Sequence, residues 1–257
     1  MRPCVTPPLL IRGAEFGGAK PLFCIPLVAR DLKQLLTQAH VAHRLEPDVV
    51  EWRADSYNES SAGSLVEAGR DLRLVLDREP ILFTLRINAE GGAKQISQDV
   101  RTHCIDTVLR SGFIDLVDVE MCNGPQFLEP IIETARHHAV RVLLSFHDFE
   151  TTPSHEVLLG KISTMISYGA DIAKIACMPQ EPGDVLRLLQ VTLSARQAFP
   201  TVPLCTTSMG SLGSLSRVAG FLFGSDMAFA VGQEVSAPCQ IPIGEARAMT
   251  EALLRYA

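Results

Sequence analysis

The stretch GADIAKIACMPQEPGD, residues 169–184, contains one charge in an otherwise apolar run: Lys174 within IAKIACM. A short apolar run that ends at a Pro-containing turn is typical of a strand buried on both faces of a parallel sheet. Burying an ammonium group is costly unless the group is paired or neutral. The stretch therefore predicts a buried strand, and it raises the question of what the lysine does there.

Seven similar apolar runs flank this one, and segments with helical spacing, such as 32–45 and 184–199, lie between them. Eight strands that alternate with helices predict an α/β fold, a single-domain (β/α)8 TIM barrel over residues 21–257. Residues 1–20, rich in Pro and Gly, are expected to form a short N-terminal extension that caps the barrel bottom. The eight runs are LFCIPLV (22–28), DVVEWRA (48–54), ILFTLRI (81–87), IDLVDVEM (114–121), VRVLLSF (140–146), DIAKIAC (171–177), VPLCTTS (202–208) and DMAFAV (226–231).

An open, doubly wound sheet is the rival architecture. That fold normally has a glycine-rich phosphate turn after its first strand. The corresponding segment here, LVARDL at 27–32, has no glycine. The barrel is therefore the favoured prediction.

Composition narrows the class of protein. Of 257 residues, 47% are hydrophobic and 20% are charged, which supports a large core and excludes general disorder. The net charge of −6 argues against nucleic-acid binding, and neither a signal segment nor a membrane-length apolar run is present. Seven scattered cysteines without a Cys-x-x-Cys motif indicate a reduced, cytoplasmic protein rather than a disulfide or zinc scaffold.

Polar residues cluster where the predicted strands end. Active sites of such barrels lie at the carboxyl ends of the strands, so these residues are the candidates for a site. A barrel mouth with this many charges is too polar to be only packed core. The set comprises Glu51, Arg53, Arg86, Glu90, Glu120, His147, Asp148, Lys174, Ser208, Met209, Arg217, Ser236 and Gln240.

Lys174 has two interpretations. It can be a rim lysine that reaches water or pairs with Asp118 or Glu120. It can also be a Schiff-base nucleophile, because apolar neighbours favour the neutral amine. The two-residue period of a strand puts Ile172, Lys174 and Ala176 on one face, so the lysine can point into the barrel.

His147 favours the nucleophile. It directly follows an apolar strand next to that of Lys174, and imine chemistry needs a group that moves protons beside the amine. Glu90, in INAEGG, can hold its imidazole in one tautomer, although alone it also fits a surface loop. No His/Glu spacing indicates a metal site, and we interpret the remaining histidines as surface residues: His40, His43, His103, His137, His138 and His155.

Three arginines at the expected mouth, Arg53, Arg86 and Arg217, indicate an anionic small-molecule substrate, since guanidinium binds carboxylate or phosphate in bidentate fashion. Structural ion pairs, such as Arg53 with Glu51 or Asp55, are the alternative. The segment SMGSLGSLSR at 208–217 offers a weak phosphate-site signal.

Seven segments in order resemble the type I 3-dehydroquinate dehydratase family, from about residue 20 to the C-terminus. Each motif alone is moderately specific, whereas seven at barrel-compatible spacing are highly specific. The segments are EWRADSY (51–57), FTLRINAEGG (83–92), DLVDVEM (115–121), SFHDFETTP (145–153), GADIAKIACMPQ (169–180), SMGSLGSLSR (208–217) and FGSDMAFA with SAPCQIPI (223–230 and 236–243).

The resemblance implies a (β/α)8 homodimer without metal or organic cofactor that dehydrates 3-dehydroquinate to 3-dehydroshikimate. It implies that Lys174 forms the imine, that His147 transfers protons and that Glu90 orients His147. For substrate binding it implies Arg217 at the carboxylate. The other implied binding residues are Glu51, Arg53 and Arg86 around the ring hydroxyls, Ser236 and Gln240 on a closing loop, and Met209 and Phe229 as apolar lining.

Three positions depart from the family pattern. Phe146 stands where a polar residue is usual, Cys239 replaces a loop glycine, and Pro26 stands where some members have serine. They motivate one alternative, an impaired paralogue that binds a quinate-like ligand. Another Schiff-base barrel enzyme, of the aldolase type, is the nearest rival. The resemblance leaves a biosynthetic or a catabolic role equally open.

Overall fold

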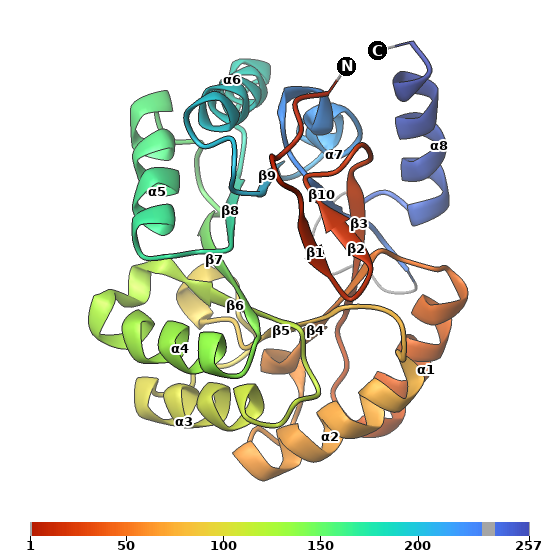
Figure 1. The fold of residues 1–257 in the computed structure, drawn as a ribbon, viewed down its shortest axis with the longest axis vertical. Helices are drawn as coiled ribbons and strands as arrows, with labels where there is room; N and C mark the ends of the chain where they lie inside the picture. Colours follow the sequence, from red (N-terminus) through yellow and green to blue (C-terminus); the bar gives the residue numbers. More distant parts are fainter. Residues whose placement is uncertain (1, 233–239, 257) are drawn as a thin grey trace.

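The computed structural model describes residues 2–232 and 240–256, and its main sheet has eight parallel strands. The predicted barrel is confirmed: helices form a ring around the sheet (Figure 1). The strands are β3 (Leu22–Leu27), β4 (Val49–Arg53), β5 (Ile81–Thr84), β6 (Leu116–Glu120), β7 (Arg141–Asp148), β8 (Ile172–Cys177), β9 (Leu204–Ser208) and β10 (Met227–Phe229).

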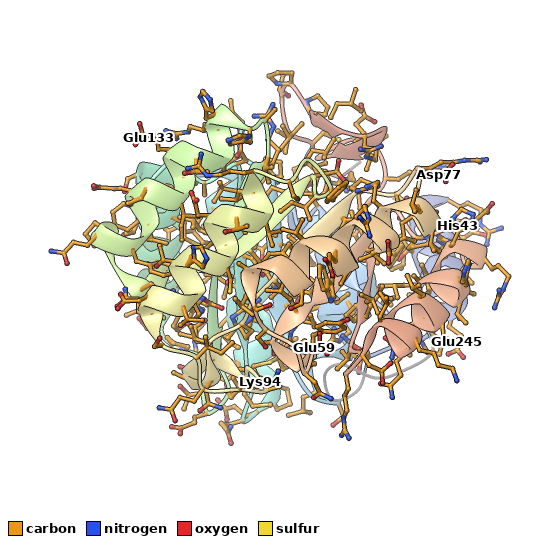
Figure 2. All side chains as sticks on the ribbon, turned by 90° about the horizontal axis from the view of Figure 1, so that it is seen from below. His43, Glu59, Asp77, Lys94, Glu133 and Glu245 are labelled. Carbon is orange, nitrogen blue, oxygen red and sulfur yellow. The ribbon has the colours of Figure 1, made fainter. Side chains whose placement is uncertain are left out.

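Helices follow the strands in turn, as the helical spacing predicts. The first begins where Asp31 caps it by accepting the amide of Gln34. Charged side chains such as Glu133 and Glu245 lie on the outside of the helical ring (Figure 2). The helices are α1 (Leu32–Arg44), α2 (Ala62–Val75), α3 (Gln98–Leu109), α4 (Pro125–His137), α5 (His155–Ser167), α6 (Pro182–Ala198), α7 (Ser214–Ala219) and α8 (Ile243–Leu254).

The strand ladder runs in the order β10-β3-β4-β5-β6-β7-β8-β9, so the first and last members are β10 and β9. These two strands meet, since the Cys205 thiol donates to the Met227 carbonyl at 3.3 Å. The sheet thus curls into a nearly closed barrel, which rules out the open doubly wound alternative. None of the described helices is long and apolar enough to cross a membrane.

Alternate strand residues build two separate apolar layers. Outward residues such as Trp52 and Phe83 pack against the helices. Inward residues near the amino ends of the strands, such as Leu82 and Ile172, fill the barrel base. Higher in the barrel the inward positions become polar, and the site occupies that end.

A two-stranded hairpin, β1 (Leu9–Ile11) and β2 (Ala14–Phe16), precedes the barrel. Its Ile11 and Phe16 are buried in the same cluster as the inward residues of the barrel base. The hairpin lies across this end of the barrel (Figure 1), where the sequence analysis expects a cap. The opposite, carboxyl end of the strands is left for a site.

Candidate active site

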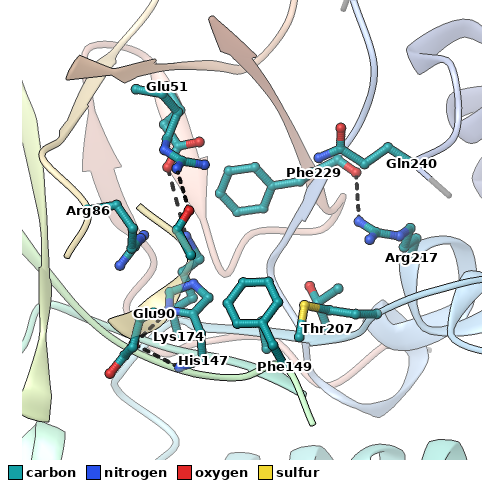
Figure 3. A pocket seen from close by; sticks show the side chains of 14 residues that line it. Glu51, Arg86, Glu90, His147, Phe149, Lys174, Thr207, Arg217, Phe229 and Gln240 are labelled. Carbon is teal, nitrogen blue, oxygen red and sulfur yellow. Dashed lines mark hydrogen bonds and ion pairs between the residues drawn. The ribbon is translucent and has the colours of Figure 1, made fainter. Parts of the chain in front are cut away.

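A cavity opens at the carboxyl end of the barrel, and Figure 3 shows the side chains that line it. The structure brings together the described residues for which the resemblance implies a role, whereas the candidates Glu120, Asp148 and Ser208 are not among the lining residues. Ser236 lies outside the described residues. The lining residues are Glu51, Arg53, Arg86, Glu90, Gly91, His147, Phe149, Lys174, Ala176, Thr207, Met209, Arg217, Phe229 and Gln240.

Lys174 points inward from β8 at the floor of this cavity and is only 6% exposed. Its Nζ donates to Asp118 Oδ2 at 2.9 Å and lies 3.9 Å from Glu51 Oε1. On another side the ring of Phe229 is centred 4.4 Å from Nζ. The pairing with Asp118 that the sequence analysis weighs as an alternative is therefore present, and a second carboxylate and an aromatic face lie beside it.

His147 and Glu90 form a hydrogen-bonded pair beside the lysine. Glu90 Oε2 accepts both the backbone amide of His147 and its ring Nδ1, each at 2.9 Å. Because Nδ1 carries the shared proton, Nε2 is the basic nitrogen. Considered alone, Glu90 also fits a surface loop. That alternative is wrong, since Glu90 is buried.

Burial sets the charge state of this pair. Desolvation lowers the pKa of His147 well below its ordinary value, and the charges of Arg86 and Lys174 lower it further. Desolvation also raises the pKa of Glu90 to about 7. The imidazole is therefore neutral at neutral pH and able to accept a proton.

Arg86 crosses the barrel interior and is held by acids of β6. Its two terminal nitrogens donate to Asp118 at 2.9 and 2.7 Å, and one of them donates to Glu120 at 3.0 Å. Burial alone would lower the pKa of Arg86, but Asp118 and Glu120 raise it above the ordinary value. Glu120 is itself bonded to Arg101 of α3 at 2.7 Å. Arg86 is thus a permanent cation in a buried ion network.

Arg53 makes the structural ion pair that the sequence analysis weighs as an alternative. Its guanidinium binds Asp55 in bidentate fashion at 2.9 and 2.8 Å, while its side chain still lines the cavity. Arg217, from α7, donates to the Phe229 carbonyl at 3.3 Å and lies across the cavity from Arg86 (Figure 3). The mouth therefore carries positive charge on both sides.

Four lining residues, Gly91, Phe149, Ala176 and Thr207, are absent from the predicted set. The Phe149 ring stacks beside His147, with ring centres 6.3 Å apart at 18°. Gly91 has φ of +83°, and a Cβ there would overlap the Phe149 ring. Alternation along a strand places Ala176 on the same face as Lys174, and Thr207 lies near the end of its strand. The sequence analysis misses these residues because small or aromatic side chains carry no charge that indicates a site.

None of the three residues that depart from the family pattern is among the described residues that line the cavity. Phe146 faces the helices rather than the cavity, with Lys161 Nζ 3.8 Å from its ring centre. Pro26 is buried on β3 next to Glu51 in the ladder, outside the set of lining residues. Cys239 lies outside the described residues.

Three histidines expected at the surface are partly buried: His43, His138 and His155. His43 Nδ1 is hydrogen-bonded to Glu79 at 2.9 Å, and an Asp77 oxygen lies within 4.8 Å of both; Figure 2 labels His43 and Asp77. This is the one group of potential metal ligands among the described residues, and it lies outside the cavity. Asp77 is exposed and pairs with Arg78 at 4.0 Å, so each acid already has a partner.

A comparison with family sequence profiles matches the type I 3-dehydroquinase family over residues 23–255. The chain belongs to the type I 3-dehydroquinase family. It is accordingly a lyase, and the cavity lies where barrel enzymes have their active sites. The family membership also accounts for the motif order found in the sequence.

Individual members of the family agree over the full chain. The 3-dehydroquinate dehydratase of Geobacillus thermodenitrificans is 40% identical over 248 residues, 96% of each chain. The 3-dehydroquinate dehydratase of Aromatoleum aromaticum is 41% identical, and the alignment covers 93% of this chain and 92% of that enzyme.

Solved structures of the family superpose closely. The crystal structure of the enzyme from Geobacillus kaustophilus has a TM-score of 0.97 at 38% identity and covers both chains fully. The type I enzyme from Clostridium difficile, solved with covalently modified comenic acid, has a TM-score of 0.94 at 32% identity and covers 97% of this chain and 99% of its own. The barrel and its connections are thus those of the type I 3-dehydroquinases.

Proposed function

We propose that this type I 3-dehydroquinase converts 3-dehydroquinate to 3-dehydroshikimate and water through an imine on Lys174. The observation that carries the proposal is a buried lysine amine in one cavity with a neutral, Glu90-bonded His147. Nucleophile, proton acceptor and orienting acid are the groups that imine-based elimination needs.

The reaction proceeds in three steps. The Lys174 amine adds to the C3 ketone, and the carbonyl oxygen leaves as water. His147 Nε2 takes a proton from C2, the electron pair forms the C1–C2 double bond, and the C1 hydroxyl leaves with a proton as a second water. One water then hydrolyses the imine, which restores the amine and releases the enone. The iminium is the electron sink that acidifies C2.

The proposed substrate contacts are those that the family resemblance implies, and the presence of these residues in one cavity supports them. Arg217 binds the carboxylate, Glu51, Arg53 and Arg86 face the ring hydroxyls, and Met209 and Phe229 supply apolar walls. Gln240 lines the same cavity; for Ser236, which lies outside the described residues, the loop role stays an expectation from the family resemblance. Arg53 and Arg86 act here mainly through their fixed charge, since Asp55 and Asp118 already occupy their guanidinium groups.

Borohydride trapping tests the proposal. Reduction in the presence of 3-dehydroquinate should add the mass of the reduced adduct at Lys174, and turnover should yield an enone that absorbs in the near ultraviolet. The K174A variant should show neither, whereas K33A, at an exposed lysine, should behave as wild type. A folded wild type that gives no adduct contradicts the proposal.

The same assay separates the alternatives. Carbon–carbon bond cleavage instead of enone formation would identify an aldolase-type enzyme. Tight binding of 3-dehydroshikimate without turnover would identify an impaired paralogue.

The proposal extends to assembly and setting. We expect a homodimer without a cofactor in the cytoplasm, acting in the shikimate pathway for aromatic amino acid biosynthesis or in quinate metabolism. Light scattering on the purified protein tests the dimer: a mass of about 28 kDa, that of a single chain, would contradict it.

A further inference from the structure

One buried acid, bonded to the cavity residue Lys174, has no part in the steps above. Asp118, on β6, has a fully buried carboxylate. Its Oδ2 accepts a hydrogen bond from Lys174 Nζ at 2.9 Å, across 56 residues of sequence. Among the residues that the structure describes it is the acid closest to the nitrogen that reacts, because Glu51 is 3.9 Å away and also accepts from Thr84 at 2.8 Å.

Three other hydrogen bonds fix the Asp118 carboxylate in place. Arg86 donates to both of its oxygens, and the Ser145 hydroxyl donates to Oδ1 at 2.6 Å. Burial on its own raises the pKa of Asp118, but Arg86 and Lys174 outweigh burial and hold it well below its ordinary value. Asp118 is therefore an anion at every working pH and is not the group that takes the amine proton.

Charge is conserved when the imine forms. An ammonium ion and a ketone give an iminium ion and one water, and the nitrogen keeps one of its three protons. The positive charge thus stays at the Lys174 nitrogen, where the iminium N–H replaces the ammonium N–H that Asp118 already accepts. The Phe229 ring, 4.4 Å from Nζ, offers its face to the same charge.

We propose that Asp118 is a catalytic residue, the counter-ion that keeps the Lys174 imine protonated through the elimination. The inference rests on the proposed function. A neutral imine withdraws electrons from C2 much less than an iminium does. Without the Asp118 anion, the imine nitrogen loses its proton at a lower pH, and proton removal from C2 is slower wherever the nitrogen is neutral. Arg86 and Ser145 act through Asp118 as positioning residues.

The test compares the pH profiles of kcat for wild type and D118N, which keeps the size of the side chain. An opposite charge within hydrogen-bond distance shifts a pKa by about 1–3 units. The alkaline limb of kcat in D118N should therefore move to lower pH by about 1–3 units. D118E, which restores the anion, should keep a limb near that of wild type even where kcat is lower.

Two controls make the result decisive. D106N changes an aspartate that also pairs with an arginine, Arg110 at 2.7 Å, but on the surface of α3, and its profile should match wild type. Cyanoborohydride, which reduces iminium ions much faster than neutral imines, should trap wild-type adduct equally well from neutral to mildly alkaline pH. That measurement needs no variant, so it applies even where D118N does not fold.

The outcomes separate the two proposals. A wild type without adduct removes the proposed function. If wild type forms the adduct, the proposed function stands and only the counter-ion role of Asp118 is still under test. That role is overturned if the kcat profiles of D118N and wild type share one alkaline limb, or if trapping of the wild-type adduct already declines near neutral pH.

Discussion

Glu90 constrains His147 twice, through its backbone amide and through its ring Nδ1. Two bonds to one carboxylate oxygen fix both the position of the residue and the tautomer of its imidazole. The neutral state of the imidazole comes from burial and from the neighbouring cations Arg86 and Lys174. At the scale of single residues, the base is thus made by its surroundings rather than by histidine alone.

This pair predicts a pH dependence. The pKa of Glu90, raised by burial to about 7, means that the carboxylate is ionised above this pH and protonated below it. A protonated Glu90 is a poorer acceptor for the Nδ1 proton, so kcat/KM should fall by up to about tenfold per unit as pH drops below about 7. E90Q, which does not titrate, should have lower activity and lack this limb. An unchanged limb in E90Q would assign it to another group.

Pairing between strands decides where each side chain emerges. The sequence predicts that the strand before His147 ends at Phe146, but β7 continues to Asp148 because it pairs with β8. Ser145 lies opposite Lys174 in the ladder and His147 lies opposite Ala176. At the scale of elements, this register puts His147 one inward position above the amine, which suits transfer of a proton from a bound substrate.

The turn between β9 and α7 positions the helix that carries Arg217. A Cβ at Gly213 would overlap the Ser208 carbonyl, so glycine is needed for this close approach. G213A should push α7 away, lower the stability by about 1–3 kcal/mol and raise KM several-fold. Urea unfolding and initial-rate kinetics measure both effects.

The matched control for this variant is G160A in α5, where a Cβ meets open space. It should raise the stability by about 0.5–1 kcal/mol, because alanine favours the helix over glycine, and leave KM unchanged. Equal behaviour of the two variants would mean that the turn tolerates a side chain.

Over the whole molecule, the two ends of the barrel have different tasks. The amino end is sealed by the β1–β2 hairpin, whose Phe16 is completely buried against the inward apolar layer. The carboxyl end holds the charged cavity. Stability and chemistry are thereby separated along the barrel axis.

This separation predicts the effect of F16A. Removing the ring should lower the free energy of unfolding by about 3–5 kcal/mol, because a large buried side chain leaves a cavity. Activity per folded molecule should stay near that of wild type. L10A, at a 67% exposed position of the same hairpin, should change the stability by less than about 0.5 kcal/mol. A large loss of kcat in folded F16A would show that the two ends are coupled.

The sequence by itself determined the barrel, the strand that carries Lys174 and the set of polar residues at the strand ends. Those features depend on local periodicity: alternation along a strand turns Lys174 inward with Ile172 and Ala176, and carboxyl strand ends converge in any such barrel. The burial of Glu90 and the pairing of Arg53 with Asp55 were each left between alternatives. The local pattern of apolar and polar residues does not show which of several possible partners a side chain will bind in the folded protein.

Only the tertiary structure decided which groups touch. Asp118 lies 56 residues from Lys174, and Glu90 lies 57 residues from His147, yet each pair is joined at 2.9 Å. Such contacts depend on strand register and side-chain conformation, which closure of the sheet sets jointly for all eight strands. In the linear sequence, a lysine in an apolar strand implies an unfavourable free energy of burial. In the folded barrel the acid Asp118 lies beside it and balances its charge.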